Sequence, residues 1–210
     1  MYISLSTSST GGYACAVRLS IDKYATKQNE IQNETQFFDW IRVSMKSVNQ
    51  VLENQPILFE SNYIYPNGLN TTTMTFKNFD HMISVHDIIE FNHNSINEIT
   101  EKYNRRQKRL INTIKQQKKI NFIRYCNNQE DIKEDEIRNF YKNINNINPK
   151  LVFNFILISD YDKLVIPNSL LKDNFIYINL NNYIDDVILN EKDDFQKIIK
   201  KYKCVFDIVK

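Results

Sequence analysis

The sequence predicts an α/β domain with a mainly parallel central sheet flanked by helices. Segments rich in β-branched and aromatic residues alternate along the chain with longer segments of helical periodicity. The clearest strand, LVFNFILIS (residues 151–159), is almost continuously apolar, as expected of a strand covered on both faces. The 210 residues suffice for a substantial core, and no repeat or linker divides them. We therefore expect a single domain over residues 1–210.

Four short apolar segments are expected to form the strands of this sheet. They are YISL (2–5), KINFIRYC (119–126), LVFNFILIS (151–159) and NFIYINL (174–180). The region 56–92 contains further aromatic and β-branched runs. These runs predict irregular strands with a turn at Pro66-Asn67-Gly68.

Helices are expected in the segments with a spaced apolar face. They cover residues 14–25, residues 37–53, a long segment that starts at Ser95, residues 130–147 and residues 191–209. Ser95 and Glu98 have the spacing of a capping box, which marks a helix start. The helix over 130–147 begins with acidic residues, which favour a helix N-terminus, and Pro149 closes it.

The composition excludes several classes of protein. A net charge of +2 provides no strong field for nucleic acid, and no run approaches the ~18 apolar residues that a membrane span needs. Three widely spaced cysteines predict no disulfide framework, and the N-terminus lacks the basic region of a secretory signal. We expect a reducing, cytoplasmic compartment. The abundance of Asn, Ile and Lys is typical of an AT-rich genome, such as that of a parasite, an amoeba or a large DNA virus in its host cytoplasm.

The stretch TGGYACAVRL (residues 10–19) places Cys15 at the start of a predicted helix. A helix N-terminus favours the thiolate, and Gly11 and Gly12 would let the backbone approach a substrate and leave amides free as an oxyanion hole. Cys15 is therefore a candidate nucleophile. The alternative is a small packed residue between Ala14 and Ala16, which is common for free cysteines.

A thiol nucleophile needs a base, and the chain has three histidines: His81, His86 and His93. His86 lies near the end of a predicted strand and is followed by Asp87, a position that suits a catalytic imidazole. His93, between two asparagines, is expected in a solvated loop. The alternative for His86 is a structural role at a turn.

A third group would orient the imidazole. Asp39 lies between Phe38 and Trp40, so it is expected to be part-buried and to need a partner. Asp160 and Asp162, which follow the buried strand, are the alternatives. Asp39 could equally cap a helix over residues 40–53.

The densest charge cluster is YNRRQKRL (residues 103–110). Arg105 and Arg109 are four residues apart on one helix face, and Arg106 flanks them. Guanidinium groups in this arrangement suit a carboxylate or phosphate ligand, although a solvated helix face fits as well. Arg124 ends an apolar strand, so we expect a specific acid or ligand beside it.

No phosphate-binding loop, dinucleotide glycine pattern, HExxH or paired CxxC occurs, so we expect no cofactor and no metal.

The motifs, taken in order, resemble a family of unknown function from bacteria and giant viruses that is labelled as papain-like cysteine peptidases. The resemblance rests on an ordered set over roughly residues 3–125: Ser4-Leu5, Gly12-Tyr-Ala-Cys15, Phe38-Asp39-Trp40, His86-Asp87, Tyr103-Asn-Arg105-Arg106-Gln-Lys-Arg109 and Phe122-Ile-Arg124. The family keeps its glycine directly after Ser-Leu, whereas here a polar insert precedes Gly12. The resemblance implies Cys15 as nucleophile and His86 as base.

Together these observations favour a thiol-dependent hydrolase or acyl-transfer enzyme, of the cysteine peptidase type, acting on a peptide or an anionic small molecule. Cys15, His86 and Asp39 or Asp160 would be catalytic, and Gly12 with Arg105, Arg106, Arg109 and Arg124 would bind substrate. The alternative is a non-catalytic or transferase-like module that binds a phosphorylated or sugar-nucleotide ligand through the arginines. A nucleic-acid-binding interaction protein is a third, weaker reading, and the oligomeric state is open.

Overall fold

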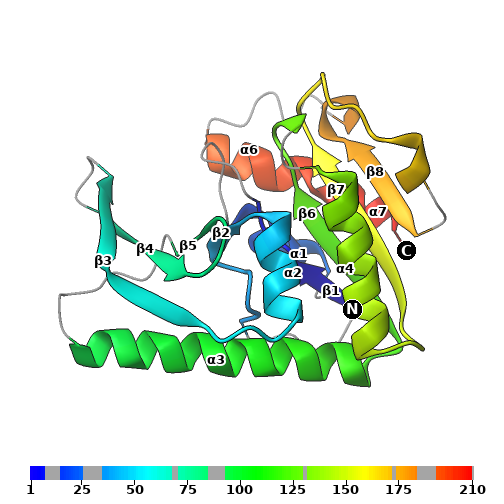
Figure 1. Ribbon diagram of the computed structural model, residues 1–210. Helices are drawn as coiled ribbons and strands as arrows, with labels where there is room; N and C mark the ends of the chain where they lie inside the picture. Colours follow the sequence, from blue (N-terminus) through cyan, green and yellow to red (C-terminus); the bar gives the residue numbers. More distant parts are fainter. Residues whose placement is uncertain are drawn as a thin grey trace.

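The computed structural model describes residues 1–7, 15–25, 35–67, 71–84, 93–129, 132–171, 174–183 and 193–209. Its centre is a four-stranded parallel sheet with the strand order β1-β6-β7-β8 (Figure 1). The strands are β1 (Tyr2–Ser4), β6 (Lys119–Tyr125), β7 (Val152–Ser159) and β8 (Phe175–Asn179). The predicted α/β class with its mainly parallel sheet is confirmed, and all four predicted strands are present.

Apolar side chains on both faces of this sheet explain why its strands lack a polar-apolar alternation. One face presents Phe122 and Phe155 to a core shared with helices α2 (Met45–Leu52), α3 (His93–Gln116) and α4 (Glu134–Ile147). The other face presents Ile123, Ile156 and Ile158 to a core shared with α1 (Ala16–Tyr24), α6 (Asp194–Lys201) and α7 (Lys203–Ile208). The sheet is therefore the middle layer between two sets of helices.

The region 56–92 contributes to a second sheet, which is antiparallel. Its strands are β2 (Ile41–Val43), β5 (Met82–Ser84), β4 (Thr71–Lys77) and β3 (Leu58–Asn67), in that spatial order. The β3–β4 hairpin extends away from the parallel sheet, above α3 (Figure 1). Pro66 and Asn67 of the predicted turn are paired residues of β3, and Gly68 lies outside the described residues.

A bridge between Thr7 and Arg42 connects the two sheets. The Val43 amide donates to the Thr7 carbonyl at 2.8 Å. The segment just after β1 therefore lies beside β2, and residues 35–43 are held close to the end of the central sheet.

The predicted helix over residues 37–53 is wrong in its first half. Residues 37–40 form a turn, residues 41–43 form β2, and α2 begins only after Ser44, whose hydroxyl accepts the Ser47 amide. Ile41 and Val43 are buried whereas Arg42 between them is partly exposed, which is the period of a strand. Asp39 therefore caps no helix at this place.

Two helix boundaries also differ from expectation. α3 already includes His93, so Ser95 lies within the helix and does not cap it, and His93 is not in a loop. The C-terminal helix is divided at Tyr202 into α6 and α7, and Asp193 caps α6 by accepting the amides of Phe195 and Gln196. Among the described residues, no helix combines the length and apolarity needed to cross a membrane.

Candidate functional site

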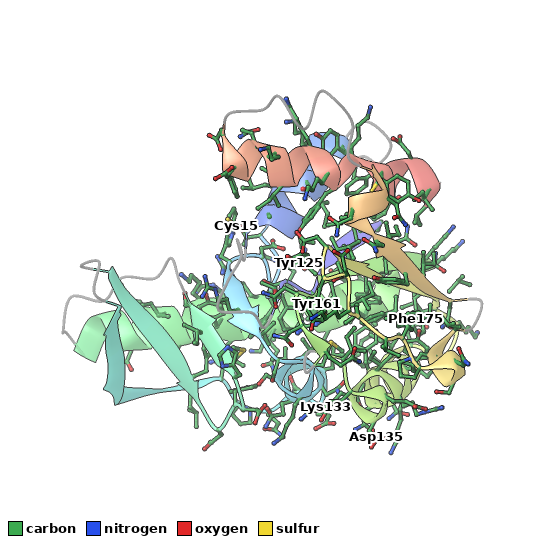
Figure 2. The ribbon with its side chains drawn as sticks, turned by 90° about the horizontal axis from the view of Figure 1, so that it is seen from above. Cys15, Tyr125, Lys133, Asp135, Tyr161 and Phe175 are labelled. Carbon is green, nitrogen blue, oxygen red and sulfur yellow. The ribbon has the colours of Figure 1, made fainter. Side chains whose placement is uncertain are left out.

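Cys15 stands at the N-cap of α1, immediately before the first helical residue. Its carbonyl accepts the Leu19 amide at 2.9 Å, and the residue is partly exposed to solvent. Figure 2 shows Cys15 at the start of α1 and Tyr125 closer to the centre of the view. Gly11 and Gly12, of the predicted oxyanion loop, lie outside the described residues.

Tyr202, between α6 and α7, links Cys15 to polar side chains at the carboxyl ends of two strands. Tyr125 ends β6, and its hydroxyl donates to the Oδ1 of Asp160, directly after β7, at 2.7 Å. The ring of Tyr125 lies 6.0 Å from the ring of Tyr202, between α6 and α7. Burial raises the pKa of Tyr202 well above its ordinary value, and charge on Tyr125, Asp160 and Cys15 adds to this effect. Cys15 and Asp160 thus share Tyr202 as an electrostatic neighbour.

The acidity of Cys15 differs from the expectation for a thiol at a helix N-terminus. Burial raises the pKa of the Cys15 thiol, and a main-chain hydrogen bond only partly opposes this. Desolvation has this direction because it disfavours the charged thiolate. Without a base to accept its proton, this thiol is mostly protonated at neutral pH.

Asp39 is fully buried in the turn before β2. Its Oδ2 accepts the Gln36 amide at 2.6 Å and lies 3.2 Å from Nη1 of Arg18. Burial raises the pKa of Asp39 to about 6, while Arg18 and the Gln36 amide act in the opposite direction. The other oxygen, Oδ1, is buried and has no hydrogen-bond partner among the described residues. A buried acid with a partner was predicted here, and the partner is an arginine.

Arg18 is the site residue that the sequence analysis missed. It belongs to the first turn of α1, is 6% exposed, and binds Asp22 through Nε at 3.0 Å and Nη2 at 2.8 Å. The sequence held a signal of its burial, because Arg18 adjoins the apolar residue Val17 in a predicted amphipathic helix. The rule applied to Asp39 and Arg124, that a buried charge needs a partner, applies to it equally.

The arginines of α3 have different partners. Nη1 of Arg109 donates to the Thr35 carbonyl at 2.7 Å, and the Arg106 guanidinium lies 5.1 Å from the centre of the Tyr103 ring and lowers the pKa of Asp39. Arg105 is exposed and lies 3.9 Å from Glu101. Arg109 therefore contacts the segment that leads into the Asp39 turn, and Arg106 lies over Tyr103 of its own helix. A role of these arginines in substrate binding stays a prediction.

Arg124 is 1% exposed and joins the two sheets. Its Nη1 donates to the Leu5 carbonyl at 3.0 Å and its Nη2 to the Val43 carbonyl at 2.9 Å. The predicted partner was an acid or a ligand, whereas two main-chain carbonyls bind these nitrogens. These contacts explain a buried guanidinium at the end of an apolar strand.

The predicted base, His86, lies outside the described residues. His81, directly before β5, contacts the start of α2 through its main chain. Its amide donates to Ser47 Oγ at 3.2 Å, and its carbonyl accepts the Ser44 amide at 2.8 Å. Within the described ranges, no three His, Cys, Asp or Glu side chains are grouped so that they could hold a metal ion.

The fold and this site define a class: an α/β protein with a cysteine at a helix start, beside the carboxyl ends of parallel strands. A family model described as "Putative papain-like cysteine peptidase (DUF1796)" matches residues 2–162, and the chain belongs to this family. No curated protein and no solved structure matches the chain. The family match includes Cys15, Asp39 and Asp160 and ends before β8, α6 and α7.

Proposed function

We propose that the protein is a thiol-dependent acyl hydrolase of the cysteine peptidase type, with Cys15 as nucleophile and His86 as general base. The observation that carries the proposal is the position of Cys15 at the start of α1, where it shares the environment of Tyr202 with Asp160. Polar side chains at the carboxyl ends of parallel strands are the usual place for a site in such folds. The family description points to the same chemistry.

The proposed substrate is a peptide, and the reaction has two stages. The Cys15 sulfur attacks the carbonyl carbon while its proton passes to the imidazole of His86. The tetrahedral intermediate collapses, the C–N bond breaks, and the imidazolium protonates the leaving amine. Water, deprotonated by the same imidazole, then attacks the thioester, releases the carboxylic acid and restores the thiol. The raised pKa of Cys15 makes the base essential to the first step.

Two acids remain candidates for orienting His86. In support of Asp160, its carboxylate accepts the Tyr125 hydroxyl, and it and Cys15 both influence the ionisation of Tyr202. Asp39 has a buried oxygen, Oδ1, with no partner in the described part of the chain, which an imidazole N–H would satisfy. The shared influence on Tyr202 favours Asp160, whereas the unpartnered Oδ1 favours Asp39.

A reducing compartment such as the cytoplasm fits this chemistry, because a catalytic thiol must stay reduced. All three cysteines are free thiols in the structure. The alternative function, binding of an anionic ligand through the arginines, receives less support. Arg106, Arg109 and Arg124 each contact a group inside the protein.

The first test is labelling by a thiol-reactive acyl probe. We expect Cys15→Ala to abolish labelling at neutral pH while the melting temperature changes little, because the side chain is only half-buried and Ala keeps its Cβ. Cys204→Ala, at a second free thiol, is the matched control and should keep the labelling. Equal labelling of the Cys15→Ala and wild-type proteins would remove the nucleophile from the proposal.

The base is tested by the pH dependence of Cys15 alkylation, followed on the Cys15 peptide by mass spectrometry. We expect the wild type to react near neutral pH and His86→Ala to react only as the pH approaches the raised thiol pKa. His93→Ala should behave as the wild type. Superimposable profiles for wild type and His86→Ala would contradict the pairing of Cys15 with His86.

A further inference from the structure

A buried ion pair links the first turn of α1 to the turn before β2. Arg18 lies three residues after Cys15, one helical turn away, and its Nη1 reaches Asp39 Oδ2 at 3.2 Å. The side chains of Arg18 and Asp39 are 7% and 0% exposed, so solvent screens this pair little. Asp22, on the next turn of α1, holds the other edge of the same guanidinium.

The turn that carries Asp39 is itself fixed from the other side, by α3. Arg109 binds the Thr35 carbonyl at 2.7 Å, and the ring of Phe37 lies 5.5 Å from that of Tyr103. Arg106 adds a positive charge near Asp39. A chain of contacts therefore runs from the long helix α3 through the turn at residues 35–39 to the first turn of α1.

We propose that Arg18 is a positioning residue for Cys15: its ion pair with Asp39 fixes the first turn of α1 and thereby the place of the thiol. This inference rests on the proposed function, because it assigns Arg18 a part in presenting the nucleophile to its base. Small displacements matter for such a pair, since a shift of about 1 Å can reduce a reaction rate by roughly two orders of magnitude.

The experiment measures Cys15 alkylation by iodoacetamide across pH for the full-length chain, in the wild type, Arg18→Met, Arg18→Lys, Asp39→Asn and the double variant Arg18→Met/Asp39→Asn. We expect Arg18→Met to slow alkylation at pH 7 by about tenfold or more and to move the profile toward that of His86→Ala. Arg18→Lys keeps the positive charge but loses the planar guanidinium group that contacts Asp22 and Asp39 at once. It should therefore keep only part of the wild-type reactivity at neutral pH. The double variant should be no slower than the more affected single variant, because both changes break the same contact.

Arg138→Met is the matched control. Arg138 forms an i, i+4 pair with Glu134, as Arg18 does with Asp22, but on the exposed surface of α4. Its removal should leave Cys15 alkylation unchanged. If Arg18→Met does not fold, Arg18→Lys and the isosteric Asp39→Asn carry the same prediction.

Two failures can be told apart. A wild-type thiol that reacts only at high pH would overturn the proposed function. Full wild-type reactivity at neutral pH in folded Arg18→Met or in Asp39→Asn, or effects of these two changes that add in the double variant, would overturn the positioning role alone. A lowered melting temperature with an unchanged pH profile would show that the ion pair is only structural.

Discussion

At the scale of single residues, the site depends on three buried or half-buried groups whose ionisation the protein shifts. Cys15 and Tyr202 are both made less acidic by burial. Asp39 is also made less acidic, although Arg18 lies against it. Desolvation therefore dominates in each case, and each group needs a specific neighbour to act as an ion.

Asp39 should make the stability of the protein depend on pH. Its folded pKa of about 6 lies above its ordinary value, so the native state binds more protons than the unfolded state between about pH 4 and pH 7. The stabilisation that Asp39 provides by binding a proton in the native state is fully present below its unfolded pKa. It is lost as the pH rises through the folded pKa of about 6. We expect the wild type to lose on the order of 2 kcal/mol of stability over this range relative to Asp39→Asn, measured by urea unfolding. Parallel curves for the two proteins would contradict this assignment.

At the scale of elements, Arg124 links the central sheet to the antiparallel one. It lies on β6 and binds the carbonyl groups of Leu5, just after β1, and Val43, the last residue of β2. This explains how a guanidinium can be nearly inaccessible at the end of an apolar strand. The two sheets meet where the chain between β1 and α1 begins, so the link also supports the site.

Replacing Arg124 with Met should destabilise the protein strongly. The change leaves two carbonyl oxygens without their donors, each at a cost of about 1–3 kcal/mol. We expect a loss of roughly 3 kcal/mol in the free energy of unfolding, measured by denaturant titration, with Arg138→Met within about 0.5 kcal/mol of the wild type. A loss of less than about 1 kcal/mol would mean that the linkage carries little energy.

At the scale of the whole molecule, helices outside the family match complete one face of the central sheet. α6 and α7 follow residue 162, yet Tyr202 and Phe206 pack in the same core as Ala16 and Ile123. The ring of Phe206 lies 5.1 Å from that of Tyr2 in β1, and the Tyr2 hydroxyl donates to the Val209 carbonyl at 2.6 Å. The two ends of the chain therefore meet on the side of the sheet that carries Cys15.

Tyr202→Ala should test this closure. Tyr202 is 3% exposed, so its loss leaves a cavity between α1, α6 and the sheet, at an expected cost of about 3–5 kcal/mol. Tyr183→Ala is the matched control, because Tyr183 is 43% exposed. Calorimetry should show a much lower melting temperature for the first variant only. Equal melting temperatures would mean that the C-terminal helices contribute little to this face.

Local patterns predicted the central sheet and its class but misplaced elements where two patterns overlap. Residues 37–53 contain apolar side chains at helical spacing, yet Ile41 and Val43 pair with β5, because β5 offers their main chain hydrogen bonds that only the folded chain provides. Because residues 37–40 form a turn and not a helix start, Asp39 caps no helix and instead pairs with Arg18.

The sequence by itself determined the parallel sheet, its apolar strands and the set of reactive side chains, because these follow from residue type and spacing over short distances. Only the tertiary structure decided which groups the buried charged side chains contact. Arg18 with Asp39, Arg109 with Thr35 and Arg124 with Leu5 are contacts between segments far apart in the chain. Buried charges must find partners, but their identity depends on how the elements pack, and no local pattern encodes that packing.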